Sequence, residues 1–169
     1  MKTIIRTGIL ACILAGGAAN ALALERPEIH FDDREWKVAN QKHEGGNITV
    51  DFIPALETPK DWTERFTTQY YGGLQEKMTP EALAAKTRES LEKSCPSIKW
   101  ESVKLTTYDV VYAWNVSGCA DLPDLSEVAR IIKGKEAIHA LHYTFRKADM
   151  PAEKRKQWLK NLVDSRLLS

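Results

Sequence analysis

The sequence predicts an α+β fold in which an antiparallel β-sheet built from hairpins is flanked by two helices. The expected order is β-β-β-α-β-β-β-β-α. Segments in which apolar and polar residues alternate come in pairs separated by short turn sequences, which is typical of β-hairpins. Two other segments each begin beside a proline and carry apolar residues at helical spacing. Helices that occur between and after β-hairpins indicate an antiparallel sheet with helices packed on it.

The first hairpin and a third strand are predicted in the N-terminal part. Trp36 and Val38 alternate with polar neighbours, Gly45-Gly46-Asn47 marks a turn, and apolar and polar residues alternate again over 48–52. After a loop with two prolines, residues 63–71 place Phe66, Thr68 and Tyr70 on one face and end at two glycines. These segments predict three neighbouring antiparallel strands.

A helix is predicted from Pro80 to about Ser94. Thr79 is a suitable N-cap, proline is favoured at the first helical position, and Glu81 in the first turn suits the helix dipole. The helix should stop before Pro96, because the residue before a proline is pushed out of helical geometry. Its thin apolar stripe indicates packing on one side, against a sheet.

The second hairpin is predicted over residues 98–106 and 109–118. A turn near residue 107 pairs positions whose numbers add to about 214, so Cys95 and Cys119 should meet at the open end of the hairpin. The apolar alternation changes phase within the first arm, which indicates a bulge. We expect a structural disulfide between these cysteines; a redox-active pair is the alternative, but the chain has no C-x-x-C motif.

A third hairpin and a second helix complete the predicted fold. Residues 126–133 could be strand or helix on propensity alone. The turn signal Gly134-Lys135, followed by the alternating segment 136–146, favours a hairpin. Pro151 then begins a helix of roughly 151–166 that carries Trp158 on its apolar side.

The first 23 residues predict export. Lys2 and Arg6 precede an apolar run over 7–19, and Ala21-Leu22-Ala23 is a suitable signal-peptidase site. We therefore expect a signal peptide over 1–23, cleavage after Ala23 and a periplasmic or secreted protein. A lipid anchor on Cys12 is the alternative, because a weak lipobox precedes it.

The mature chain, residues 24–169, suits one globular α+β domain without a transmembrane helix. Because both basic residues of the signal are removed, 22 Lys and Arg residues remain against 23 Asp and Glu. This balance argues against a nucleic-acid partner, since binding phosphates needs a basic surface. The two remaining cysteines, an even number in an oxidising compartment, are consistent with a disulfide.

The order of these elements resembles the PsbP-like α+β sandwich of small secreted and lumenal accessory proteins. The resemblance is topological and covers most of the mature chain. Residues 48–63 and 129–145 are also similar to stretches of small exported bacterial proteins without assigned function. The resemblance implies a binding or accessory role in place of catalysis.

The candidate ligand or partner surface is a cleft lined by Trp62, Arg65 and Tyr71. Trp62 lies in the proline-bearing loop 57–63, where an indole either fills one end of the sandwich or forms an exposed binding anchor. Tyr71 alternates with Tyr70 and should point to the opposite face of the sheet. Both interpretations of Trp62 remain open from the sequence.

No catalytic, cofactor-binding or metal-binding residues are predicted. His139 and His142 have opposite parity on one strand and should not share a metal, and the chain has neither a G-x-S-x-G nor an H-E-x-x-H motif. A surface metal site near His30 is the weaker alternative. We therefore expect an exported, non-catalytic binding or envelope-accessory protein with an unknown protein or small-ligand partner. A small periplasmic hydrolase with its site on loops at one end of the sandwich is the alternative function.

Overall fold

The structure is a computed structural model that describes residues 25–168; the predicted signal peptide lies outside the described residues. Its elements are β1 (Arg26–Pro27), β2 (Trp36–Glu44), β3 (Asn47–Pro54), β4 (Glu64–Gly72), the 3-10 helix η1 (Leu74–Glu76), α1 (Pro80–Ser94), β5 (Lys99–Leu105), β6 (Asp109–Val116), β7 (Leu125–Lys133), β8 (Ala137–Phe145), α2 (Ala152–Asp164) and β9 (Leu167–Leu168). No helix described here is long and apolar enough to span a membrane.

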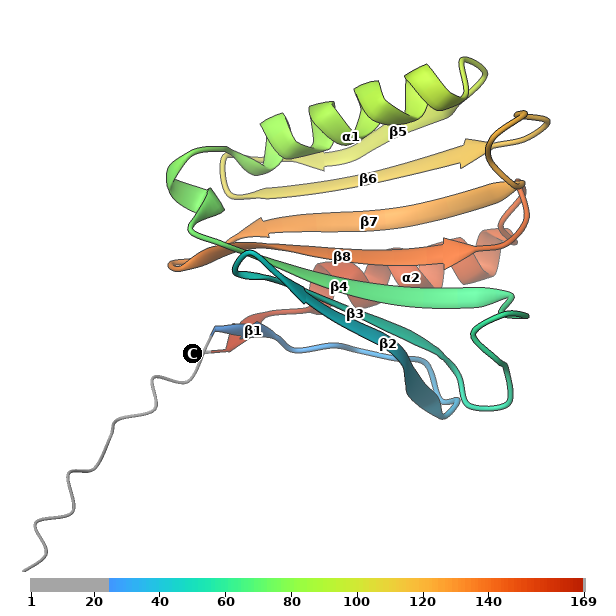
Figure 1. The fold of residues 1–169 in the computed structure, drawn as a ribbon, viewed down its shortest axis with the longest axis horizontal. Coiled ribbons are helices and arrows are strands. Elements are labelled where there is room, and N and C mark those ends of the chain that lie inside the picture. Colours follow the sequence, from blue (N-terminus) through green and yellow to red (C-terminus); the bar gives the residue numbers. More distant parts are fainter. Residues whose placement is uncertain (1–24, 169) are drawn as a thin grey trace, which may run out of the picture.

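Seven strands form one antiparallel sheet in the order β2-β3-β4-β8-β7-β6-β5 (Figure 1). The three predicted hairpins are β2–β3, β5–β6 and β7–β8. The pairing of β4 with β8 joins the two halves of the chain. The predicted α+β class and element order are confirmed; η1 and the short β1–β9 pair were not predicted.

Local sequence signals account for the hairpin registers. Gly45 and Gly46 turn the β2–β3 hairpin with φ values of 56° and 84°, which glycine adopts without steric cost. In β5–β6, Lys99 pairs with Asn115, the register expected from a turn near residue 107. The expected bulge lies between Ser102 and Lys104.

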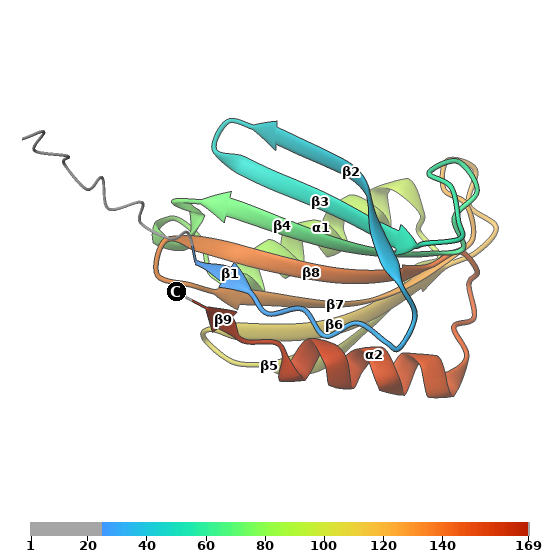
Figure 2. The ribbon, with the colours of Figure 1, turned by 90° about the horizontal axis from the view of Figure 1, so that it is seen from below.

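The two helices cover opposite faces of the sheet (Figure 2). The Thr79 hydroxyl accepts a hydrogen bond of 3.1 Å from Ala82 N and caps α1, as predicted. α1 buries Ala84 against alternate residues of β6, β7 and β8; this first core is made of Ala84, Cys95, Val110, Tyr112, Trp114, Val116, Ala129, Ile131, Ile138 and Ala140. The thin stripe of α1 therefore packs on a sheet, as expected.

α2 closes the second core on the other face. Trp158 is fully buried and stacks on Tyr143 of β8, with ring centroids 4.1 Å apart. Arg130 of β7 donates hydrogen bonds to the carbonyls of Leu162 (2.6 Å) and Ser165 (2.7 Å), which lie at the end of α2. A cation here satisfies terminal carbonyls and complements the helix dipole.

The helices are offset across the sheet. α1 contacts β6 and β7, whereas the contacts to β4 and β8 are made by the short helix η1. In Figure 1, α1 is drawn in front of β5 and β6 and leaves the middle of β4 in view. Polar residues of β4 and β8 therefore stay accessible beside the helix.

Candidate functional site

One row of side chains crosses the sheet beneath α1 and forms the floor of the candidate site. Arg65 of β4 pairs with Thr144 of β8, Thr144 with Glu127 of β7, and Glu127 with Trp114 of β6. Directly paired residues on adjacent antiparallel strands point to the same face and lie about 5 Å apart. The register alone therefore places two charged groups and an indole in line.

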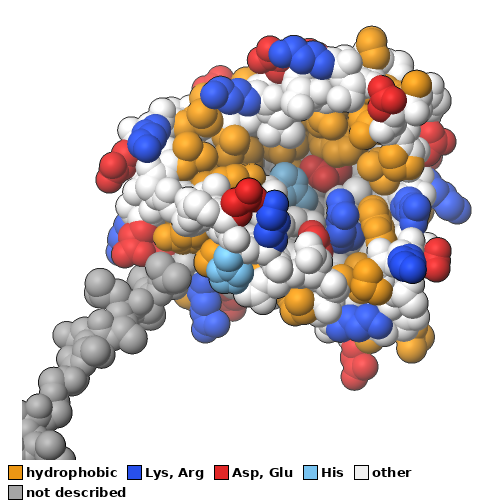
Figure 3. Space-filling view, viewed as in Figure 1, with side chains coloured by type: hydrophobic (Ala, Val, Ile, Leu, Met, Phe, Trp, Pro, Cys, Tyr) orange, Lys and Arg blue, Asp and Glu red, His pale blue; other side chains and the backbone are white. Residues whose placement is uncertain are grey.

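A groove of about 230 Å³ runs along this row between β4 and α1. Its wall on the helix side is formed by Thr87 and Leu91 of α1. The space-filling view shows this face hollowed, with hydrophobic side chains along the helix side and both basic and acidic side chains on the other (Figure 3). The groove thus has an apolar side at Leu91, a polar floor, and Arg65 as the basic residue of its lining.

Glu127 is the central polar group of the floor. It is 9% exposed, and its carboxylate accepts three hydrogen bonds: 3.0 Å from Trp114 Nε1, 2.9 Å from Thr144 Oγ1 and 2.9 Å from His142 Nδ1. Burial by itself raises the pKa of Glu127, but the charge of His142 and the three hydrogen bonds outweigh burial and lower that pKa. The carboxylate is therefore ionised and held in place by its neighbours.

A chain of hydrogen bonds leads from Glu127 along the groove. His142 Nε2 lies 3.1 Å from Gln69 Oε1, and the same oxygen accepts a bond of 2.8 Å from Tyr71 Oη. The two ring nitrogens of His142 thus face Glu127 on one side and Gln69 on the other. Both ring nitrogens of His142 are therefore engaged by the protein.

At one end of the groove, two guanidinium groups flank the Trp62 indole. The guanidinium carbon of Arg65 lies 4.5 Å from the Trp62 ring centroid, and that of Arg146 lies 5.4 Å away. Arg146 also donates to the carbonyls of Lys60 (3.4 Å) and Trp62 (3.3 Å), which ties the loop to the end of β8. Trp62 is half-buried and belongs to neither core. Its exposure is therefore intermediate between that of a side chain that fills the end of the sandwich and that of an exposed binding anchor.

The structure brings together two of the three residues of the predicted cleft. Trp62 and Arg65 are in contact, whereas Tyr71 lies six residues beyond Arg65 on β4, about 20 Å along the strand. Tyr71 does point to the α1 face, where it packs against the first core, and burial raises its pKa. It reaches the groove only through Gln69.

The histidines of β8 lie on opposite faces, as their parity predicted. His142 is on the α1 face, whereas His139 lies 3.5 Å from Glu25 on the other face. Burial lowers the pKa of His139, and the nearby Glu25 opposes this shift. Within residues 25–168, no three His, Cys, Asp or Glu side chains are arranged to hold a metal ion.

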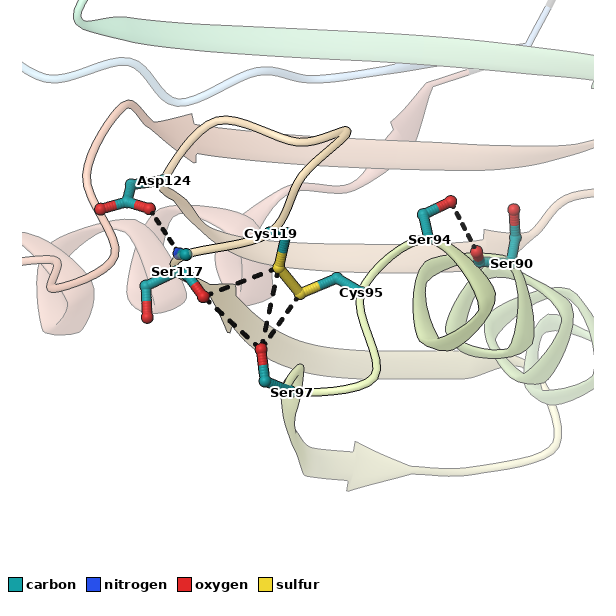
Figure 4. The surroundings of a disulfide bond; sticks show 8 residues. Ser90, Ser94, Cys95, Ser97, Ser117, Cys119 and Asp124 are labelled. Atoms are coloured by element: carbon teal, nitrogen blue, oxygen red, sulfur yellow. Dashed lines mark hydrogen bonds between the residues drawn. A yellow bond between two sulfur atoms is a disulfide. The ribbon is translucent and has the colours of Figure 1, made fainter.

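The cysteine pair lies at the far end of β6, where its position is compatible with a disulfide. The Cα atoms of Cys95 and Cys119 are 5.5 Å apart, and their sulfur atoms are bonded in the structure. Ser97 lies beside both sulfurs, and Asp124 accepts a 3.0 Å bond from Gly118 N (Figure 4). The bond would fasten the end of α1 to the β6–β7 loop.

Another hollow, of about 370 Å³, lies on the α2 face near the start of α2. Its lining includes Glu101 and Arg155, which pair with each other at 2.8 Å. We take the groove beside α1 as the candidate site, because Arg65 of the predicted cleft lines it.

Sequence reasoning did not single out Glu127, Thr144 or Trp114 as site residues. A signal was present in the third hairpin, because Glu127 and His142 share by parity the face of the apolar residues Ala129, Ile131, Ile138 and Ala140. The turn at Gly134-Lys135 places Glu127 opposite Thr144. Arg65 comes to lie beside Thr144 only through the pairing of β4 with β8, and no turn in the sequence specifies that pairing.

Comparisons with known proteins leave the family open. No family model and no curated protein sequence matches the chain. A solved structure described as LpqN, involved in cell envelope biogenesis of Mycobacterium tuberculosis, aligns at 10% identity and a TM-score of 0.41, over 88% of each chain. This likeness is too distant to indicate a function, and the PsbP-like resemblance is not shown by these comparisons.

Proposed function

We propose that the protein is an exported, non-catalytic binding protein of the cell envelope that holds a small ligand in the groove between β4 and α1. The observation that carries the proposal is the groove itself, which combines an apolar wall with a rigid polar floor. Pockets with apolar walls and a few fixed polar groups are typical of small-molecule sites.

The floor is built to keep its shape. Glu127 is bonded to side chains of three positions on β6 and β8, and its register partners lie on adjacent strands. Groups whose hydrogen bonds are made within the protein lose little freedom when a ligand arrives. A preorganised floor of this kind favours binding.

Export is supported by the signal-like N-terminus and by the cysteine pair. Cys95 and Cys119 are placed for a disulfide, and such bonds persist in oxidising compartments. The proposal therefore places ligand binding outside the cytoplasm.

The five tryptophans offer a direct test by ¹⁵N-indole NMR. Trp62 and Trp114 lie at the groove, whereas Trp36 and Trp158 pack together on the opposite face. Small-molecule fractions from the native cell envelope should shift the Trp114 signal and leave that of Trp158 in place. If Trp158 alone responds, or if Trp114 is silent toward every fraction, the groove is not the binding site.

The Glu127–His142 pair is the one observation that favours the alternative hydrolase. A catalytic histidine needs a free nitrogen directed at the substrate or nucleophile. His142 Nε2 instead faces Gln69, and among residues 25–168 no Ser, Thr or Cys side chain is hydrogen bonded to His142.

Turnover of p-nitrophenyl acetate separates the two functions. We expect no difference in rate between the wild-type protein and His142→Gln. A rate that falls at least about a hundredfold in the variant, the size of a general-base contribution, would establish the hydrolase.

A further inference from the structure

We propose that the groove recognises a ligand carrying a carboxylate or phosphate group, and that the Arg65 guanidinium binds this group. The inference rests on the proposed binding function of the groove and names the chemistry of its ligand. It is carried by a juxtaposition at the mouth of the groove, where Arg65 has no acceptor of its own.

Arg65 is partly exposed, and its guanidinium makes no hydrogen bond to any residue that the structure describes; its one ion pair among them, with Asp51, is long. Its side chain is 36% exposed, while its Nε atom is buried without a hydrogen-bond partner. Within the described part of the chain, Asp51 is the one acid near this guanidinium, and its oxygen is 4.0 Å from Nε. The terminal nitrogens of the fork likewise make no hydrogen bond to residues 25–168.

The neighbouring acids already accept hydrogen bonds from other side chains. Asp51 accepts bonds from Thr67 Oγ1 at 2.6 Å and from Asn40 Nδ2 at 3.2 Å. Glu127 lies two strands from Arg65, about 10 Å away, and is held by its own three donors. These acids therefore leave the positive charge of Arg65 uncompensated at hydrogen-bond distance.

Trp62 sets the direction of the fork. Its indole lies against the Arg65 guanidinium at 4.5 Å, a contact that positions an arginine without using its N–H groups. Arg146 contacts the same ring, but its Nη1 donates to two loop carbonyls. Arg65 is thus the residue of the pair whose donors remain for a ligand.

A planar fork with free N–H groups matches carboxylate and phosphate, which it binds through two parallel hydrogen bonds. The body of such a ligand would lie along the groove, where Leu91 and Trp114 supply apolar surface. The ligand expected from this geometry has an anionic head and a partly apolar body.

The test uses phenyl phosphate, benzoate and the neutral benzyl alcohol as probes, titrated into the full mature protein and followed by ¹⁵N-indole NMR. Phenyl phosphate or benzoate should shift the Trp62 signal, and the tighter of the two identifies the head group. Benzyl alcohol should bind at least about tenfold more weakly, because it offers no charge-assisted acceptor. Equal binding of the neutral probe would overturn the proposal.

Three arginine variants locate the interaction. Arg65→Gln should weaken the anionic probe about tenfold or more, and Arg65→Lys should restore part of the affinity, since lysine keeps the charge but loses the fork. Arg146→Gln removes the same charge from the same indole and should weaken binding less than about threefold. Equal losses of affinity in Arg65→Gln and Arg146→Gln would indicate a general electrostatic attraction and would refute specific binding by the Arg65 guanidinium.

Thermal unfolding of each variant confirms that it is folded. The outcome is also separable from that of the proposed function. If envelope fractions shift Trp114 equally in the wild-type protein and in Arg65→Gln, the groove binds a ligand but Arg65 does not recognise an anion.

Discussion

Replacing Glu127 with glutamine tests whether the floor of the groove depends on a buried negative charge. Glutamine keeps the shape and retains one carbonyl oxygen for Trp114 Nε1 and His142 Nδ1, which both bond to the same oxygen of Glu127. Its amide nitrogen replaces the oxygen that accepts from Thr144. The substitution therefore removes the charge and one acceptor while filling the same volume.

The expected loss of stability is about 2–3 kcal/mol at pH 7. Hydrogen bonds to a charged group contribute about 1.5–3 kcal/mol each, against about 1 kcal/mol for neutral ones, and two of the three bonds survive in neutral form. Glu127→Ala should cost more, about 3–5 kcal/mol, because it leaves buried donors without any acceptor.

The loss should depend on pH in a defined direction. The folded-state pKa of Glu127 lies below its usual value of 4.5, so its stabilising contribution is fully present above pH 4.5 and is lost as pH falls through the folded pKa. Protonated glutamate resembles glutamine in shape and charge. The wild-type advantage over Glu127→Gln should therefore shrink below pH 4.5.

Urea unfolding followed by tryptophan fluorescence, at several pH values between 7 and 3, measures this difference. Glu101→Gln is the control, because Glu101 is 63% exposed and pairs with Arg155 at the surface. It should change stability by less than about 1 kcal/mol, as exposed ion pairs contribute little. If Glu127→Gln behaves like the control at pH 7, or if its effect stays constant down to pH 3, the assignment of a buried charge is refuted.

Three further outcomes are expected. Non-reducing peptide mapping of protein purified from the periplasm should join Cys95 to Cys119, and replacing both with serine should cost about 2–4 kcal/mol of unfolding free energy; two free thiols would contradict the bond. Intact-mass analysis should find Leu24 as the mature N-terminus, and a diacylglyceryl group on Cys12 would instead establish a lipoprotein. Arg130→Ala should lower stability by about 2–3 kcal/mol, because Asp109 loses its 2.8 Å partner and keeps only Lys104, and the carbonyls at the end of α2 lose their donor; a urea midpoint close to that of the wild type would contradict this role.

The sequence by itself determined the elements and the local pairings. Period-2 alternation and glycine turns specify hairpins, because a strand shifted by one residue would turn its apolar side chains to the wrong face. The bulge in β5 and the approach of Cys95 to Cys119 followed from the same counting. Thr79 and Pro80 likewise defined the start of α1 through contacts within a few residues.

Only the tertiary structure decided where the groove lies. The pairing of β4 with β8, which no turn encodes, put Arg65 in one row with Thr144 and Glu127. The placement of α1 and α2 on opposite, offset parts of the sheet left that row accessible beside α1. Tyr71 is different, because both its face and its distance of about 20 Å from Arg65 follow from the predicted strand 63–71. Alternation fixes which way a side chain points, whereas long-range packing decides which neighbours it meets.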